Sequence, residues 1–314
     1  MRYFLPCILT ISTLLSCSRD NDPLQGGKPA EQKTISLTVD GNARSFILYL
    51  PSGYDLAGKM PVILAIHGGN GTPEGMVRIA DFKPVAERDK VVLVYPAGIQ
   101  KNWNDGRPTT PNQLGIDDVN FFNQLCDHLV AKYPVDDTRI YATGISNGGF
   151  MSARLGCQLS NRIAAIAVVA ATMEATVIAP NCSPGRPVPA MFIHGTTDPL
   201  VPFTGGEMTA GGTAGGTILS HFGAIEKWVG INGCSNLPSV TDLPDIASDG
   251  TTIRRRVYTG GTNGSEVVSY VVLNGGHTWP QGYQYLNELF IGKTSQDMNG
   301  CEVIWEFFRR FSRS

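Results

Sequence analysis

The chain has 314 residues, of which 42% are hydrophobic and 17% are charged, so it can bury a substantial core in one large domain. Its formal net charge of −2 leaves no basic surplus for phosphate neutralisation, which argues against a nucleic-acid partner. The 36 glycines indicate many tight turns and close backbone approaches rather than long helices.

The first residues predict an export signal. Arg2 precedes an apolar run over 5–15, which is too short to span a bilayer but has the length of a signal-peptide core. The run ends in Leu-Leu-Ser-Cys, which resembles a bacterial lipobox whose cysteine, here Cys17, is lipidated. We expect a lipoprotein signal peptide over 1–16 and a lipid anchor to the bacterial envelope, at the outer membrane or cell surface. An ordinary signal peptide, giving a secreted or periplasmic protein, is the alternative.

A flexible tether is expected to follow, because residues 17–33 are polar and rich in glycine, proline and charge. No repeat, second linker or transmembrane candidate appears after it. Residues 34–314 are therefore expected to form a single catalytic domain.

Strand and helix patterns alternate through this domain. The first two strand-like runs change polarity residue by residue around Asp40-Gly41, which predicts a hairpin, and the later ones are continuously apolar, as in parallel strands buried on both faces. This alternation predicts an α/β fold with a mostly parallel twisted sheet and helices on both faces. The expected helices are 117–132, 147–159, 218–229 and 297–311, and the expected strands are 34–40, 44–50, 61–68, 91–98, 139–146, 163–170, 188–195 and 265–276.

A candidate nucleophile lies between one of these strands and the helix after it. The string Gly144-Ile-Ser146-Asn-Gly148 matches G-x-S-x-G, the nucleophile elbow of α/β-hydrolases, in which small residues allow a strained turn around the serine. The strand before it and the helix after it strengthen the match, because a glycine-rich turn without chemistry is the alternative. Ser146 is the predicted nucleophile.

A candidate oxyanion hole follows an earlier strand. His67-Gly68-Gly69-Asn70 resembles the HG-x segment of the same fold. A tetrahedral intermediate carries negative charge on the former carbonyl oxygen, which needs preorganised N–H donors. We expect these donors to be the backbone N–H groups of Gly69 and of Asn147, the residue after the nucleophile.

The base and the acid follow from chain order, since this fold places its acid and then its histidine after the serine. His277, on a Gly-Gly loop after a strand, is the predicted base. Asp198 directly follows an apolar strand, which predicts that it faces the same edge of the sheet as Ser146. The remaining histidines, interpreted as structural or out of order, are His67, His128, His194 and His221, and the rival acids, in a polar loop without a preceding strand, are Asp242, Asp245 and Asp249.

Together these strings resemble a family of secreted esterases. HGGNG (67–71), WNDGRP (103–108), GISNGGFM (144–151), HGTTDPLVPF (194–203) and GGHTWP (275–280) occur in the order found in polyhydroxybutyrate depolymerases, feruloyl esterases and acetyl-xylan esterases. The resemblance covers roughly residues 34 to 311. It implies the α/β-hydrolase fold, the triad Ser146, Asp198 and His277, and Trp103 and Trp279 as walls of the substrate pocket, with plain hydrophobic packing as the alternative for both indoles.

The expected activity is serine carboxylic-ester hydrolysis through an acyl-enzyme, on feruloyl or acetyl esters of plant cell-wall polysaccharide. Three alternatives remain open: a polyhydroxybutyrate-type polyester depolymerase, a serine peptidase of the same fold, and an inactive carbohydrate-binding lipoprotein. No cofactor and no metal is expected, since no nucleotide-binding or metal-ligand spacing appears. Acyl specificity depends on pocket shape, which the sequence does not give.

Seven cysteines are present, and export would permit disulfides. We expect Cys157 to pair with Cys182, Cys234 to pair with Cys301, and Cys126 to be a buried thiol. The family's usual cysteine before the strand leading to the histidine is absent from 258–262. The glycine-rich loop 204–217 is interpreted as a surface loop, with a flap over the site as the alternative.

Overall fold

A computed structural model describes residue 1, residues 27–208 and residues 215–313. The predicted signal peptide and the lipidation site Cys17 therefore lie outside the described residues. Within the described ranges, no helix combines the length and the apolar character that crossing a membrane requires.

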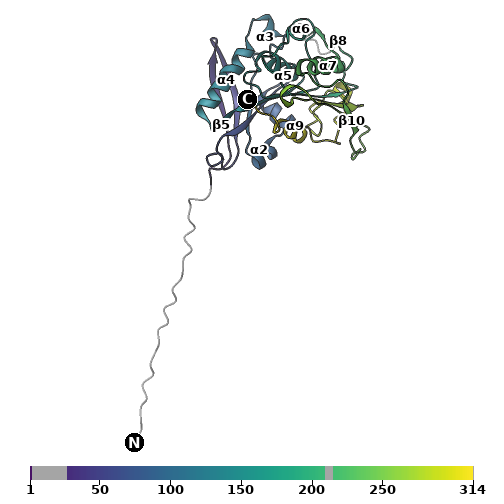
Figure 1. The fold of residues 1–314 in the computed structure, drawn as a ribbon. Helices are drawn as coiled ribbons and strands as arrows, with labels where there is room; N and C mark the ends of the chain where they lie inside the picture. Colours follow the sequence, from purple (N-terminus) through teal and green to yellow (C-terminus); the bar gives the residue numbers. More distant parts are fainter. Residues whose placement is uncertain (2–26, 209–214, 314) are drawn as a thin grey trace.

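A ten-stranded sheet forms the centre of the molecule, in the order β1-β2-β4-β3-β5-β6-β7-β12-β11-β10 (Figure 1). The strands from β4 to β12 in this order are parallel, and the strands at both edges are antiparallel. This confirms the predicted mostly parallel sheet. Its strands are β1 (Glu31–Val39), β2 (Asn42–Leu50), β3 (Met60–Ile66), β4 (Val92–Pro96), β5 (Val135–Ile145), β6 (Ala165–Val169), β7 (Ala190–Gly195), β10 (Ser239–Asp242), β11 (Thr252–Tyr258) and β12 (Val267–Leu273), and a separate small sheet pairs β8 (Gly206–Glu207) with β9 (Thr217–Ile218).

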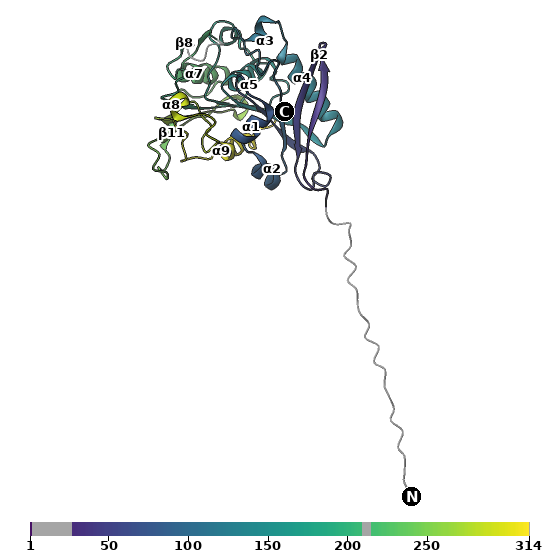
Figure 2. The ribbon, with the colours of Figure 1, turned by 180° about the vertical axis from the view of Figure 1, so that it is seen from behind.

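Helices cover both faces of the sheet, as predicted for strands buried on both sides. Side chains of α4, α5 and α7 belong to one hydrophobic core, and those of α1, α2 and α9 to a second core on the other face. The two views in Figures 1 and 2 show these helix layers above and below the strands. The helices are α1 (Pro73–Ile79), α2 (Lys83–Asp89), α3 (Thr110–Gln113), α4 (Asp118–Lys132), α5 (Asn147–Gln158), α6 (Ile178–Asn181), α7 (His221–Asn232), α8 (Glu288–Ile291) and α9 (Gly300–Phe308), with a 3₁₀ turn η1 (Thr262–Gly264).

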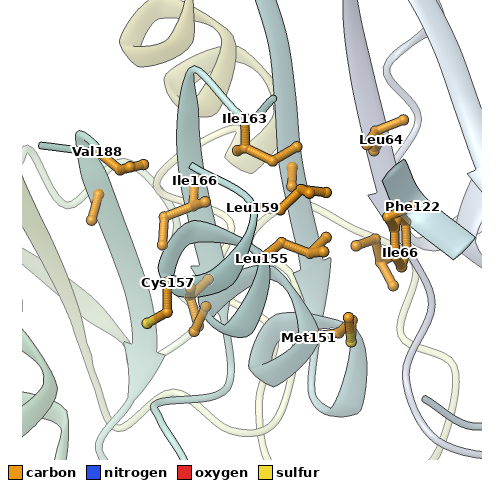
Figure 3. Close-up of a cluster of buried hydrophobic side chains, with 14 of the residues drawn as sticks. Leu64, Ile66, Phe122, Met151, Leu155, Cys157, Leu159, Ile163, Ile166 and Val188 are labelled. Atoms are coloured by element: carbon orange, nitrogen blue, oxygen red, sulfur yellow. The ribbon is translucent and has the colours of Figure 1, made fainter. Parts of the chain in front are cut away.

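Helix α5 is the central element for function, because it begins directly after Ser146. Met151 and Leu155 on this helix point into a cluster of buried side chains that includes Leu64 and Ile66 of β3 and Phe122 of α4 (Figure 3). Burying a side chain of this size stabilises the fold by about 1.5–3 kcal/mol. This packing fixes the start of α5 against the ends of the neighbouring strands.

The predicted boundaries differ at several ends. β1 begins at Glu31, so three residues of the predicted tether 17–33 already alternate in exposure within the first strand. The hairpin prediction is confirmed, with left-handed φ values of 49° at Asp40 and 76° at Gly41, as such two-residue turns require. β12 ends at Leu273, which leaves the Gly-Gly-His segment as a loop.

The sequence did not predict the strands β11 and β10, which form one edge of the sheet. The segment that contains Asp242 and Asp249 was expected to be a loop without strands, yet Asp242 ends β10, which pairs with β11. Arg254 of β11 donates a hydrogen bond to Asp242 through Nε over 2.6 Å. β10 is exposed and β11 is mostly half-buried, and the polar side chains of both strands lack the apolar pattern that identifies buried strands.

One of the two expected disulfides forms. Cys157 and Cys182 are bonded, which confirms that pairing. The pairing of Cys234 with Cys301 is wrong, because both are free thiols and they belong to the cores on opposite faces of the sheet. Cys126 is a buried free thiol as predicted, and burial raises its pKa to about 12.

Candidate active site

The predicted nucleophile stands on a strained turn between β5 and α5. Ser146 has φ 57° and ψ −124°, a combination that is costly for a residue with a side chain. Ala, or any larger residue, cannot replace the flanking glycines, since a Cβ on Gly144 would lie 2.6 Å from Ile66 O and one on Gly148 would lie 2.1 Å from the same atom. The two glycines therefore let the turn press against the end of β3.

The predicted oxyanion segment lies beside this turn. A Cβ on Gly68 would lie 3.3 Å from Ser146 Cβ, and one on Gly69 would lie 3.8 Å from Asn147 Cβ. Asn147 is the first residue of α5, so its N–H is one of the helix donors that have no intrahelical acceptor. The structure thus brings both expected donor residues next to the serine.

His67 fixes this segment through its ring. Its Nδ1 lies 2.7 Å from Gly68 O, and its Nε2 accepts a hydrogen bond from Gly98 N over 3.0 Å. Because Gly98 N can only donate, the proton is on Nδ1. Burial lowers the pKa of His67 to about 4, which keeps the imidazole neutral.

The WNDGRP segment, 103–108, clamps the other side of the turn. Asn147 accepts from Trp103 N over 2.8 Å through Oδ1, and through Nδ2 it donates to Trp103 O over 3.1 Å and to Asp105 Oδ2 over 2.6 Å. Asp105 is in turn held by Arg107, whose Nη2 lies 2.6 Å from the same oxygen. All four side chains are buried, so this network fixes the rotamer of Asn147.

The predicted acid and base meet on the neighbouring strand ends. Asp198 follows β7 and His277 follows β12, and Asp198 Oδ2 lies 2.7 Å from His277 Nδ1. Asp198 Oδ1 accepts from the backbone N–H groups of Leu200 and Val201, each over 2.8 Å. Burial opposes ionisation of Asp198, but the charge of His277 and hydrogen bonds from His194 and His277 outweigh it and hold the pKa of this carboxyl well below its usual range.

Glycines allow the histidine loop to approach. A Cβ on Gly195 would lie 2.2 Å from Gly275 O, and one on Gly276 would lie 2.1 Å from Ile291 O. His277 N donates to Ile291 O over 2.6 Å, and Tyr285 Oη donates to His277 O over 2.9 Å. The backbone on both sides of the imidazole is therefore fixed.

The histidines interpreted as structural have backbone or serine partners. His194 Nε2 lies 3.0 Å from Val201 O, but it also lies 3.3 Å from Asp198 Oδ2, so it contacts the acid, which the sequence did not reveal. His221 Nε2 lies 2.7 Å from Ser269 Oγ in the core, and burial lowers its pKa well below the usual value.

Ser146 and His277 line one cavity of about 430 Å³, together with Gly69 and Asn147. The predicted triad requires the His277 imidazole to lie on the same side of the molecule as Ser146, and both residues line this one cavity. Apolar side chains form much of the wall, and they are Met76, Ile79, Ile145, Leu200, Val201, Met208 and Leu286.

Trp103 and Trp279, which were predicted to form pocket walls, do not line this cavity, and both are buried in the core. Trp103 donates through Nε1 to His67 O over 3.0 Å, so it supports the oxyanion segment from behind. Trp279 packs edge-on against Phe82 with ring centroids 5.9 Å apart. These contacts are core packing, which was the alternative given for both indoles.

The sequence did not predict two residues of the cavity wall, Arg107 and Met208. Arg107 lies within the WNDGRP string, but its sequence context does not reveal that its side chain reaches the cavity. Met208 belongs to the glycine-rich loop 204–217, which was interpreted as a surface loop, and it also lines the cavity. Residues 209–214 of that loop lie outside the described residues. Within the described ranges, no group of three or more histidine, cysteine or acidic side chains is placed to hold a metal ion.

The chain is similar in sequence to known esterases. Residues 62–212 match a family model described as phospholipase/carboxylesterase. A Nocardia uniformis subsp. tsuyamanensis protein named as an esterase is 28% identical over 279 residues, which cover 86% of this chain and 80% of that protein. Feruloyl esterase C of Emericella nidulans is 25% identical over 279 residues, covering 87% of this chain and 89% of the relative.

Among solved structures, the acetyl xylan esterase from Aspergillus awamori superposes with a TM-score of 0.57 at 14% identity, over 88% of this chain and 99% of that one. At this identity the likeness concerns the fold. The chain therefore has the α/β-hydrolase fold, and the resemblance to feruloyl and acetyl-xylan esterases is confirmed.

Proposed function

We propose that the chain is a serine carboxylic-ester hydrolase that cleaves feruloyl or acetyl esters of plant cell-wall polysaccharide. The observation that carries this proposal is the convergence of Ser146, on its strained turn, with His277 in one cavity, where Asp198 lies 2.7 Å from the imidazole. The names of the relatives supply the substrate class, since they include feruloyl esterases and a bifunctional acetylxylan esterase/xylanase.

The reaction is a two-step acyl transfer. His277 Nε2 takes the proton of Ser146 Oγ as this oxygen bonds to the ester carbonyl carbon. The oxyanion that forms accepts hydrogen bonds from the N–H groups of Gly69 and Asn147. When the intermediate collapses, the bond from carbon to the alcohol oxygen breaks, and the imidazolium gives its proton to that oxygen. Water, activated by the same imidazole, then releases the acid and regenerates the hydroxyl.

The environment of each group fits its role. Asp198 is an ionised carboxylate at neutral pH because its pKa is held low, so it can orient Nδ1–H and stabilise the imidazolium. The Asn147 side chain is fully engaged by Trp103 and Asp105, so the N–H of the same residue keeps its direction as charge develops. Preorganised donors of this kind need no rearrangement during the reaction.

The test compares Ser146→Ala with the full chain on methyl ferulate and on acetylated xylan oligomers. We expect turnover to fall by about 10⁴-fold or more, while the protein stays folded. Ser152→Ala is a matched control, because Ser152 is a buried serine of α5, the helix that follows Ser146. Its hydroxyl donates to Gly148 O over 2.8 Å. Retained ester cleavage in Ser146→Ala would refute the proposal.

We also propose export and lipid anchoring through Cys17, with no cofactor required for the reaction. Support comes from the sequence, in which a charged residue, an apolar core and a lipobox-like end occur in the expected order. Labelling of expressing bacteria with a radioactive fatty acid tests the anchor. Label in the full chain and none in Cys17→Ser is expected, and equal labelling of the two would disprove it.

A further inference from the structure

Arg107 places a buried cation in the wall of the cavity. The whole residue is only 3% exposed, and its guanidinium lies over the Phe150 ring, 3.9 Å from the ring centroid. Nε and Nη2 both donate to Asp105 Oδ2, over 3.0 and 2.6 Å. Two of the three guanidinium nitrogens are thus bound to the carboxylate of Asp105, which does not line the cavity.

The third nitrogen has a poor partner. Arg107 Nη1 lies 2.9 Å from Met208 Sδ, and both of these residues line the cavity. A thioether sulfur is a weak acceptor, whereas a charged N–H forms its strongest hydrogen bonds with oxygen. The cavity wall therefore holds a strong donor whose acceptor, the Met208 sulfur, is weak.

The rest of the described wall offers no competing acid. Among the lining residues that the structure describes, none is aspartate or glutamate. Arg107 is the one arginine or lysine among these described lining residues, so no acidic side chain of the described wall competes for its Nη1.

We propose that Arg107 forms a subsite that binds an acceptor oxygen of the substrate through Nη1. This inference rests on the proposed esterase function and adds to it a determinant of substrate choice. The oxygen has two possible sources: the hydroxyl or methoxyl group of an aromatic acyl chain, or the carboxylate of an acidic sugar on the alcohol side. The chemistry is shared, and the substrates of the test separate the two sources.

A purely structural role for Arg107 is the rival explanation. Arg107 holds Asp105, which holds Asn147, so its loss could disturb the oxyanion donors. Such a disturbance would slow every ester by the same factor. A lost subsite would instead slow only esters that carry the acceptor oxygen. The readout is therefore a ratio of kcat/KM values between matched substrates.

The experiment measures kcat/KM of the full chain and of Arg107→Met on two pairs of esters. Methyl ferulate and methyl cinnamate differ in the ring oxygens of the acyl group. 4-Acetoxyphenylacetate and 4-methylphenyl acetate differ in a carboxylate on the alcohol side. Arg154→Met is the matched control. Arg154 also holds the 103–108 segment, because it donates to Asn104 O over 2.7 Å, but it does not line the cavity.

We expect Arg107→Met to lower the ratio of oxygenated to plain substrate by roughly 10- to 100-fold in one pair, as for loss of a charge-assisted hydrogen bond. Arg154→Met should leave both ratios unchanged. A fall in the first pair identifies the aromatic acyl oxygen, and a fall in the second identifies the carboxylate. Equal slowing within both pairs, or no change in either, overturns the subsite. If the unmodified chain cleaves none of the four esters, the proposed function itself fails.

Discussion

Two histidines line the same cavity, and they differ in what holds them. His67 and His277 both follow buried strands and both are 2% exposed. The His67 ring is held on both nitrogens by backbone groups of Gly68 and Gly98. The His277 ring meets the carboxylate of Asp198 at Nδ1, and its Nε2 is left for the reaction. Partner chemistry, rather than burial or loop position, therefore separates a supporting imidazole from a reacting one.

The largest effect should come from removing the reacting imidazole. His277→Ala leaves Ser146 without a base, and we expect kcat on methyl ferulate to fall by about 10⁴-fold or more. Thermal unfolding monitored by circular dichroism should show a folded protein. Turnover within tenfold of the unmodified chain would mean that another group takes the serine proton.

Removing the supporting imidazole should cost less. His67→Ala frees Gly68 O and Gly98 N, so the oxyanion segment loses its fixed position, and we expect kcat to fall by roughly 10- to 100-fold with little change in KM. Steady-state kinetics on methyl ferulate separates the two constants. A loss confined to KM would show that His67 acts on substrate binding instead.

The low pKa of His67 predicts a pH effect on stability. The pKa of His67 falls from 6.5 to about 4 on folding, so the unfolded chain binds more protons between these values. Stability should therefore decrease as the pH falls from 6.5 towards 4, with a contribution from His67 on the order of 3 kcal/mol. Urea unfolding across this range should show a flatter dependence in His67→Gln, which cannot take up the proton. Identical slopes in the two proteins would contradict the neutral assignment.

The smallest effect on activity is expected at Trp279, two residues after the reacting histidine. Trp279→Phe should lower the free energy of unfolding by about 1–3 kcal/mol, because a large buried side chain shrinks. It should leave kcat/KM on methyl ferulate within about twofold, since the indole lies outside the cavity. A tenfold loss of kcat/KM without loss of stability would restore a substrate role for this indole.

The sequence predicted those parts of the site that strand ends determine. Ser146, Asp198 and His277 each follow an apolar strand, and parallel strands bring their carboxyl ends to one edge, so chain order was enough to bring these residues together. Burial patterns likewise revealed the central sheet. The polar strands β10 and β11 carry no such pattern, which explains why they were missed.

The walls of the cavity were not predictable in the same way. Trp103 and Arg107 lie four residues apart in one segment, yet one faces the core and the other reaches the cavity. That outcome depends on how a loop folds over α5, and no periodic pattern records it. The same holds for Cys234 and Cys301, whose separation by the sheet is a property of topology rather than of spacing.

The absence of space for a Cβ at Gly144 and Gly148 has a consequence for engineering. Because both glycines abut Ile66 O, the serine turn and the end of β3 must move as a unit, and the oxyanion segment continues directly from that end. We therefore expect libraries that vary the cavity-lining residues Met76, Ile79 or Leu286 to change the shape of the cavity while the serine turn keeps its geometry. Random changes at the strand ends would mostly yield inactive clones.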